Sequence, residues 1–276
     1  MTNVSGTPET QRFYEETGWT VQDGASVDHN LFGATEDGPI RMELHRVHND
    51  RVRKILSGAG SPLNMLECGC GGNPERSFLD LCSRYVGVDF SERGVKVAQS
   101  AFADVTIPHE FKSADICSLP FRSGEFDAVY SAHVIYHIAN AAAQKAALGE
   151  FVRVVRPGGV VVLIAANPHP LVFPVRLLRR VAADTPLLGP LLDRIRPRPL
   201  LPYKPMSITW MKRQLARGGA VDVVSAGIPS IGFYRNVTEF DGVGRLLWNA
   251  VRALDIHYPQ LSAYLGNYVL LSCRKA

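Results

Sequence analysis

The chain of 276 residues carries little net charge and has no long apolar run. Lys and Arg number 30 against 26 Asp and Glu, which gives a net charge of +4. This surplus is too small for a nucleic-acid-binding domain, in which Lys and Arg cluster on one face. No stretch of about eighteen apolar residues occurs without a charge, so we expect no transmembrane helix. The polar N-terminus lacks the apolar stretch of a signal peptide, and we expect a cytoplasmic protein.

Cysteine is also scarce. The chain has five cysteines, and an odd number in a long chain argues against a disulfide framework. Cys68 and Cys70 lie within a glycine-rich segment, and we interpret both as small buried side chains rather than metal ligands. No acidic cluster has ligand spacing, so the sequence does not predict a metal site.

Strand and helix patterns alternate through the middle of the chain. Short apolar runs typical of buried strands occupy residues 64–68, 85–89, 126–131 and 160–165. Helix patterns at 91–101 and 140–155 separate them, and this alternation predicts a parallel sheet with right-handed crossovers. Further elements are predicted as helices at 42–56 and 208–217, strands at 221–226 and 268–274, and a helical stretch at 237–254.

Two segments depart from this rhythm. Residues 1–40 are polar and are predicted to form loops. Residues 167–206 hold nine of the eighteen prolines, with leucines and arginines between them. We interpret this insert as a lid or a contact in a homodimer. The alternatives are a membrane-surface patch and an arginine clamp for an anionic or carbohydrate acceptor.

We predict one domain over residues 1–276. Its parts are an N-terminal acceptor or lid region (1–58), a cofactor-binding core (60–166), the insert (167–206), and a C-terminal part of the sheet (207–276) with a helical insertion at 232–264.

A glycine-rich turn follows the first strand of the core, in the segment Leu66–Pro74. A strand that enters such a turn and then a helix lets the backbone approach a ligand and points free N–H groups at it. Asp89, at the end of the next strand, is placed to take both ribose hydroxyls. A dinucleotide fingerprint would need a glycine where the chain has Pro74, which disfavours a dehydrogenase. The carboxylate of Glu67 would repel a pyrophosphate but suits a cationic sulfonium ligand.

Four segments in order resemble the class I S-adenosylmethionine-dependent methyltransferases. They are Glu67–Gly71, Val86–Ser91, Ser113–Phe121, and Phe126–Ser131 followed by the turn Arg156–Gly159. The resemblance covers residues 60–166 and the closing strand at 268–274, and departs at Asn73–Pro74, where many relatives begin a helix. It implies a doubly wound, Rossmann-like α/β fold whose seven-stranded sheet is mostly parallel with an antiparallel last strand.

The same resemblance implies S-adenosylmethionine as the cofactor. The glycine turn would cradle its methionine part, Asp89 would bind the ribose, Asp115 would hold the exocyclic amine and Ile116 would pack on the adenine ring. The predicted cofactor-binding residues are Glu67, Gly69, Cys70, Gly71, Asn73, Asp89, Phe90, Ser91, Asp115, Ile116, Cys117 and Ala132.

Two histidines directly follow the strand at 126–131, in the region that faces the sulfonium in this fold. Transfer of a methyl group to an alcohol needs a base, and histidine is the usual choice near neutral pH. We predict His133 and His137 as catalytic candidates, which would share one face if the segment were helical. The alternative for each is a histidine held by hydrogen bonds beneath the cofactor. Predicted acceptor-binding residues are Tyr14, Trp19, His29 and His169.

The sequence therefore predicts an O-methyltransferase for a small-molecule hydroxyl, with a sugar or glycoside as the preferred acceptor. The first forty residues resemble bacterial methyltransferases associated with polysaccharide assembly. Two alternatives stay open. One is methylation of a lipophilic phenol, quinone or lipid, with peripheral membrane contact through the insert. The other is a protein that binds the cofactor without transferring its methyl group.

Overall fold

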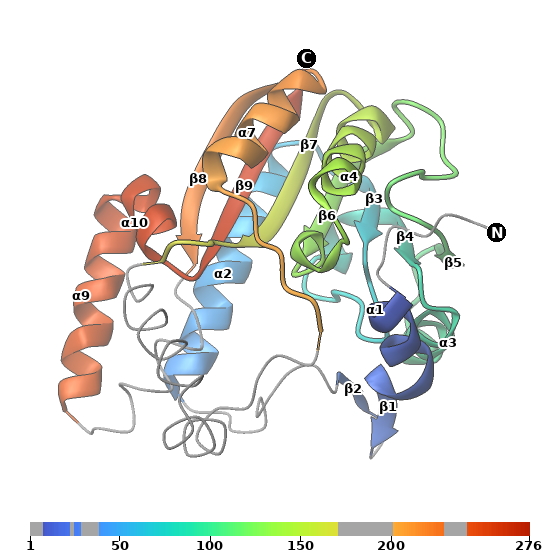
Figure 1. The fold of residues 1–276 in the computed structure, drawn as a ribbon, viewed down its shortest axis with the longest axis horizontal. Coiled ribbons are helices and arrows are strands. Elements are labelled where there is room, and N and C mark those ends of the chain that lie inside the picture. Colours follow the sequence, from blue (N-terminus) through green and yellow to red (C-terminus); the bar gives the residue numbers. More distant parts are fainter. Residues whose placement is uncertain (1–7, 23–24, 29–38, 171–200, 229–241) are drawn as a thin grey trace.

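A seven-stranded sheet forms the centre of the molecule (Figure 1). The computed structural model describes residues 8–22, 25–28, 39–170, 201–228 and 242–276. The strands are β3 (Leu63–Cys68), β4 (Cys82–Asp89), β5 (His109–Ser113), β6 (Phe126–Ala132), β7 (Val155–Ala166), β8 (Ala220–Ile228) and β9 (Tyr268–Lys275). Their order is β5-β4-β3-β6-β7-β9-β8, and β9 alone runs against the others. This confirms the predicted doubly wound sheet.

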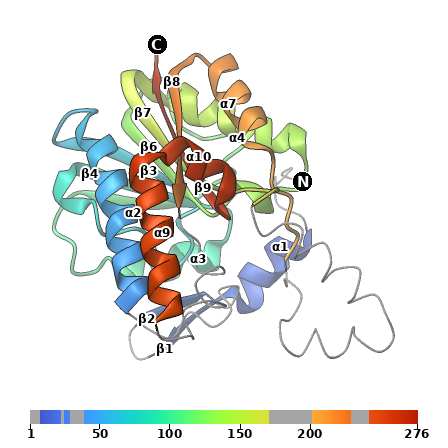
Figure 2. The ribbon, with the colours of Figure 1, turned by 90° about the vertical axis from the view of Figure 1, so that its left-hand side faces the viewer.

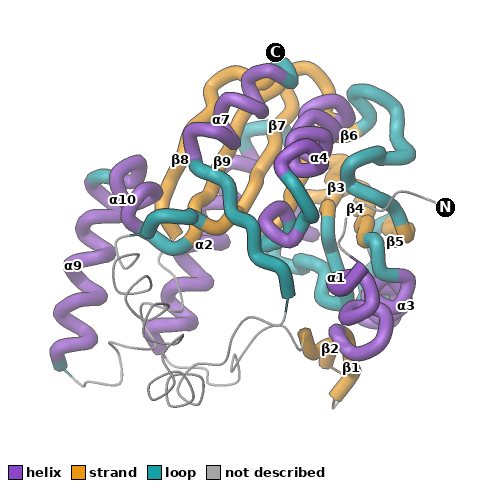
Figure 3. Tube along the Cα trace, in the orientation of Figure 1, coloured by secondary structure: helices purple, strands orange, loops and turns teal. Residues whose placement is uncertain are grey.

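Helices cover both faces of the sheet, as Figures 2 and 3 show. On one face lie α2 (Pro39–Ser57) and α3 (Glu92–Ala101), with α9 (Val243–His257) beside α2. On the other lie α4 (Ala141–Val154) and α7 (Ile208–Arg217), and α10 (Pro259–Leu265) packs on β8. Both faces of the central strands are buried, so these strands are apolar throughout instead of alternating. None of these helices, nor the described part of any other, is long and apolar enough to cross a membrane.

The described N-terminal residues, 8–22 and 25–28, form helices and strands, and the prediction of loops there was wrong. The chain forms α1 (Pro8–Phe13), the π-helical turn η1 (Tyr14–Gly18) and a hairpin of β1 (Trp19–Gln22) and β2 (Ala25–Asp28). The Glu15 carboxylate accepts the backbone N–H groups of Glu92 and Arg93 at 2.8 and 3.4 Å, which caps the N-terminus of α3. The Arg93 side chain donates to the carbonyl oxygens of Trp19 and Glu16 at 2.9 and 2.8 Å. Contacts with α3, rather than local sequence preference, thus hold this segment.

Two further differences concern the core. Strand β5 was not predicted, because it is an edge strand in which only Phe111 is buried and polar side chains surround it. No α-helix follows the glycine turn: the chain passes from Gly69 to a single 3₁₀ turn at Leu79–Leu81 before β4 begins. The expectation of a helix at this point was wrong, and the loop must be held by other groups.

Candidate cofactor and acceptor site

The predicted site residues follow strands whose carboxyl ends lie level in the sheet. Cys68 pairs with Val88, and Asp89 with Ser113, so the ends of β3, β4 and β5 meet. Ala132 pairs with Ile164, which brings the end of β6 beside β7. The carboxyl edge of an open α/β sheet is where such folds bind ligands.

The glycine loop is tied to the end of β4. Gly69 N–H and Cys70 N–H both donate to the carbonyl of Val88, at 2.7 and 3.1 Å. The buried Asp89 carboxylate accepts the N–H groups of Gly71 and Ser91, both at 2.9 Å. These bonds fix the direction of the carboxylate, which is the group predicted to bind the ribose.

The remaining predicted cofactor-binding residues lie around the corner formed by the glycine loop and the carboxyl ends of β3 and β4. Phe90 and Asp115 are half-buried, Ile116 is buried, and an Asp115 oxygen accepts the N–H of Cys117 at 2.9 Å. Ala132 is half-buried at the end of β6, whereas Asn73 is exposed on the loop. A carboxylate, two apolar side chains and a glycine backbone fit a purine nucleoside with an amino-acid tail. Cys68 and Cys70 are buried, which confirms their interpretation as small core side chains.

Glu67 supports the loop from within. It is 5% exposed, and its carboxyl group accepts the Tyr85 hydroxyl and, at 2.9 Å, the N–H of Glu75. Burial raises the pKa of Glu67 to about 8, against the lowering effect of these hydrogen bonds. Without a cation beside it, the group is therefore largely protonated at pH 7, and a sulfonium or ammonium group bound close by would lower this pKa. The hydrogen bond from the Glu75 N–H to Glu67 holds the loop, after which no α-helix follows. Direct contact of Glu67 with the cofactor stays a prediction.

Trp19 packs on the glycine loop. The indole is 7% exposed, and its buried Nε1–H has no hydrogen-bond partner among the described residues. Its ring stacks with Tyr14 at 5.7 Å between centroids, and Tyr14 meets Phe90 edge-on at 6.0 Å. The structure thus places these two predicted acceptor-binding residues next to the predicted cofactor residues, and their contact with an acceptor stays a prediction.

Gly71 is the position where this packing is tightest. A Cβ at Gly71 would lie 2.1 Å from Trp19 Cζ2, at a backbone φ of +51°. We expect Gly71→Ala to lower the free energy of unfolding by about 1–3 kcal/mol. We also expect weaker binding of S-adenosylhomocysteine, by about tenfold or more, since the loop must move. Denaturation and titration calorimetry measure the two effects.

Gly219→Ala is the matched control for Gly71→Ala. Its φ is +93°, but a Cβ there meets no atom within 4 Å. It carries the cost of the backbone conformation without the collision. If Gly71→Ala lowered the free energy of unfolding no more than Gly219→Ala, Trp19 would not pack on the glycine loop as described.

His133 lies at the end of β6 in an unusual backbone conformation. Its φ is +64°, its N–H donates to the Ile164 carbonyl at 3.0 Å, and its side chain is exposed. A non-glycine residue in this region is strained, and such strain gathers at functional sites. The positive φ also ends the strand, so the segment is not the α-helix that would align the two histidines.

His137 points elsewhere. It belongs to a 3₁₀ turn (Ile135–His137), and its Nδ1–H donates to the Pro202 carbonyl at 2.9 Å. Burial lowers the pKa of His137, so its ring is neutral at pH 7. The hydrogen bond joins the turn to the last residues of the insert. This geometry favours the alternative of a supporting histidine, and since the segment is not an α-helix, the condition under which the two histidines would share a face is not met.

Two tyrosines beside His133 were not among the predicted residues. The Tyr136 hydroxyl lies 3.2 Å from His133 Nδ1, and the Tyr268 ring packs edge-on against the imidazole at 4.7 Å. Tyr203, near the end of the insert, contacts Tyr136 at 5.1 Å between ring centroids. Tyr136 could have been found from the sequence, because it lies only three residues after His133 in one short segment. No sequence signal links Tyr268 to this segment, because the sheet order brings them together.

The two remaining predicted acceptor-binding residues are His169 and His29. His169 is exposed just beyond β7, and its N–H donates to the Asn167 side chain at 3.0 Å. His29 lies outside the described residues. Within the described ranges, no group of three or more His, Cys, Asp or Glu side chains is placed to hold a metal ion.

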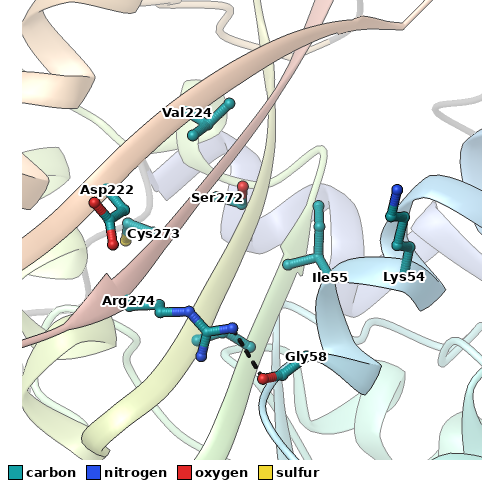
Figure 4. Close-up of a pocket in the computed structure, with 9 residues that line it drawn as sticks. Lys54, Ile55, Gly58, Asp222, Val224, Ser272, Cys273 and Arg274 are labelled. Atoms are coloured by element: carbon teal, nitrogen blue, oxygen red, sulfur yellow. Dashed lines mark hydrogen bonds between the residues drawn. The ribbon is translucent and has the colours of Figure 1, made fainter.

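A separate pocket of about 220 Å³ lies between the end of α2 and strands β7, β8 and β9 (Figure 4). Arg274 donates to the Gly58 carbonyl at its rim at 2.9 Å. Val160 lies toward the amino end of β7 and Arg274 near the end of antiparallel β9, so the pocket is at the amino edge of the sheet. We do not assign it to the cofactor, because ligands of such sheets bind at the carboxyl edge.

The fold and this corner define a nucleotide-binding α/β domain. Residues 66–163 match the family model described as "Methyltransferase domain". This match, on the fold and the site described above, places these residues among the class I S-adenosylmethionine-dependent methyltransferase domains, whose cofactor is S-adenosylmethionine.

Relatives support the same placement over part of the chain. A tRNA (carboxymethyluridine(34)-5-O)-methyltransferase of Arabidopsis thaliana is 30% identical over 113 residues, covering 41% of this chain and 26% of that protein. A demethylmenaquinone methyltransferase of Thermus thermophilus is 35% identical over 120 residues, covering 44% and 49%. The chain thus spans about half or less of the length of these curated relatives. The geranyl diphosphate C-methyltransferase structure from Streptomyces coelicolor shares the fold, with a TM-score of 0.56, 15% identity and coverage of 98% and 99%.

Proposed function

We propose that the chain transfers the methyl group of S-adenosylmethionine to a hydroxyl of a small-molecule acceptor, with His133 as the general base. The observation that carries the proposal is an exposed histidine, held in a strained conformation, at the carboxyl end of β6. When bound, the cofactor supplies an electrophilic methyl group. The protein has to orient the acceptor oxygen within about 3–3.5 Å of the methyl carbon and exclude water. It also has to remove the hydroxyl proton, because a neutral alcohol is a poor nucleophile.

A sugar or glycoside is the preferred acceptor class. Tyr203 is 41% exposed and Tyr268 is half-buried, so both rings have surface near His133. A tyrosine offers an apolar ring face and a polar tip, which suits the faces and hydroxyls of a sugar. Trp19 supplies little of this surface, because it is buried against the glycine loop.

A lipophilic phenol or quinone is the second candidate. Exposed apolar side chains, including Leu261 and Tyr264, lie on α10. The carbonyl of Tyr264 accepts the Asn167 side-chain amide at 2.8 Å, so this surface adjoins the end of β7. Large exposed apolar patches often mark ligand or membrane contact. One relative named above is a demethylmenaquinone methyltransferase.

An acceptor panel tests the proposal. The purified chain is incubated with S-adenosylmethionine carrying an isotopically labelled methyl group and with methyl glycosides, simple phenols or menadiol, with and without liposomes. We expect label in a glycoside and formation of S-adenosylhomocysteine. Label only in menadiol or phenols would favour the second candidate. Binding of S-adenosylhomocysteine by calorimetry without transfer to any of them would contradict the proposed hydroxyl transfer and favour a binding protein.

A further inference from the structure

The Tyr136 hydroxyl occupies the centre of a short chain of hydrogen bonds. It lies 3.2 Å from His133 Nδ1 on one side and is hydrogen-bonded to Tyr268 on the other. The Tyr136 side chain is 5% exposed, and Tyr268 packs its ring against the imidazole at 4.7 Å. Three side chains from two distant parts of the sequence therefore meet at one hydroxyl oxygen.

A hydroxyl group has one proton to donate, whereas its oxygen can accept more than one hydrogen bond. Burial and the neighbouring tyrosines raise the pKa of Tyr136 well above its ordinary value, so the hydroxyl stays protonated. The proton of Tyr136 can therefore go to only one of its two neighbours, Tyr268 or His133 Nδ1. When it goes to Tyr268, the lone pairs of the Tyr136 oxygen face the imidazole.

We infer that Tyr136 is a positioning residue that accepts the Nδ1 proton of His133 and so keeps the lone pair of that histidine on Nε2. The inference rests on the proposed function, in which Nε2 removes the acceptor proton. In that step the O–H bond of the acceptor breaks and its proton goes to Nε2. The new C–O bond forms as the C–S bond breaks, and the bonding pair stays on sulfur. The Nδ1–H bond to Tyr136 stabilises the imidazolium that results.

The backbone supports this assignment. The positive φ of His133 turns the chain at the end of β6, and the 3₁₀ turn that follows brings Tyr136 back to Nδ1. Lys204 N–H donates to the Tyr136 carbonyl at 2.7 Å, which holds that turn from outside. The ring orientation of His133 is thus fixed from two sides, by Tyr136 and by Tyr268. A histidine's reactive nitrogen is commonly selected by the partner of its other nitrogen.

Nitrogen NMR of the S-adenosylhomocysteine complex tests the inference, because the chemical shift of a ring nitrogen shows whether it carries the proton. The signals of His133 are identified by their loss in His133→Asn. We expect the proton on Nδ1 in the wild type and a shift of its population to Nε2 in Tyr136→Phe. Tyr268→Phe should have the same effect, because Tyr136 is then free to donate to Nδ1. An Nε2 proton in the wild type, or an unchanged spectrum in both variants, would overturn the inference.

Kinetics with the best acceptor of the panel give the second readout. We expect Tyr136→Phe to lower kcat by about 10–100-fold, with little change in the KM for S-adenosylmethionine. Tyr258→Phe is the control, since it removes the same hydroxyl from a side chain that is 63% exposed at the start of α10. Full activity of Tyr136→Phe beside a slow His133→Asn would overturn the inference. Full activity of both variants would instead contradict the proposed base, and the nitrogen spectrum alone would then decide the tautomer.

Discussion

Replacement of His133 by Asn is expected to lower kcat for methyl transfer by about 10²–10⁴-fold, the usual contribution of a general base. Asn cannot take the acceptor proton, but it tolerates the left-handed backbone conformation that His133 adopts at φ +64°. The substitution therefore removes the base with little added strain. Radiolabel transfer to the best acceptor measures kcat, and calorimetry with S-adenosylhomocysteine measures the affinity for the cofactor product.

The cofactor affinity of His133→Asn should stay within about twofold of wild type, because none of the groups that hold the glycine loop is changed. His257→Asn at the end of α9 is the matched control, since this exposed side chain lies on a different helix. A His133→Asn enzyme that kept more than about a tenth of the wild-type kcat would remove His133 as the base.

Glu67→Gln is expected to stabilise the protein increasingly as the pH rises from about 5 to 8. In the folded state the pKa of Glu67 is about 8, whereas in the unfolded chain the group titrates near its ordinary value of 4.5. Between these values the unfolded chain releases a proton that the folded chain retains, so the free energy of unfolding falls with increasing pH. Gln is neutral and keeps an acceptor oxygen for Tyr85 and Glu75. We expect an advantage of about 4 kcal/mol at pH 8 and almost none at pH 4.

Thermal unfolding of both proteins over this pH range measures the effect. Other titrating groups are the same in the two proteins, so the difference in Tm isolates Glu67. A gain of about 4 kcal/mol corresponds to several degrees in a chain of this size. Glu9→Gln changes an exposed glutamate on α1 and should give parallel curves. Parallel curves for Glu67→Gln as well would show that the buried carboxyl is ionised in the folded state.

The sequence predicted those parts of the fold that depend on local pattern. Buried parallel strands are apolar on both faces, so β3, β4, β6 and β7 could be found from their composition. Strand β5 could not, because an edge strand with a single buried residue looks like a polar loop. The N-terminal helices and strands were not predicted for a different reason. Their stability comes from Glu15 and Arg93, whose contacts join residues more than seventy positions apart.

The site was predictable where its residues follow strand ends. Asp89 and His133 come directly after predicted strands, and the sheet brings both to its carboxyl edge. The roles of their neighbours depended on geometry that no spacing reveals. Glu67 holds the loop through Tyr85 and the Glu75 N–H, a role that the spacing did not reveal, and its contact with the cofactor stays a prediction. Tyr268 joins His133 only because β9 enters the sheet next to β7.

The position of β9 has a consequence for how the protein is made. This strand comes after β7 and β8 in the sequence, yet it pairs between them. During synthesis on the ribosome both neighbours emerge before it, each with an unpaired edge that can associate with another nascent chain. The strand that closes this gap also carries Tyr268 to the imidazole of His133. Completion of the sheet and completion of the reactive corner are therefore the same folding event, and a partly folded chain lacks both.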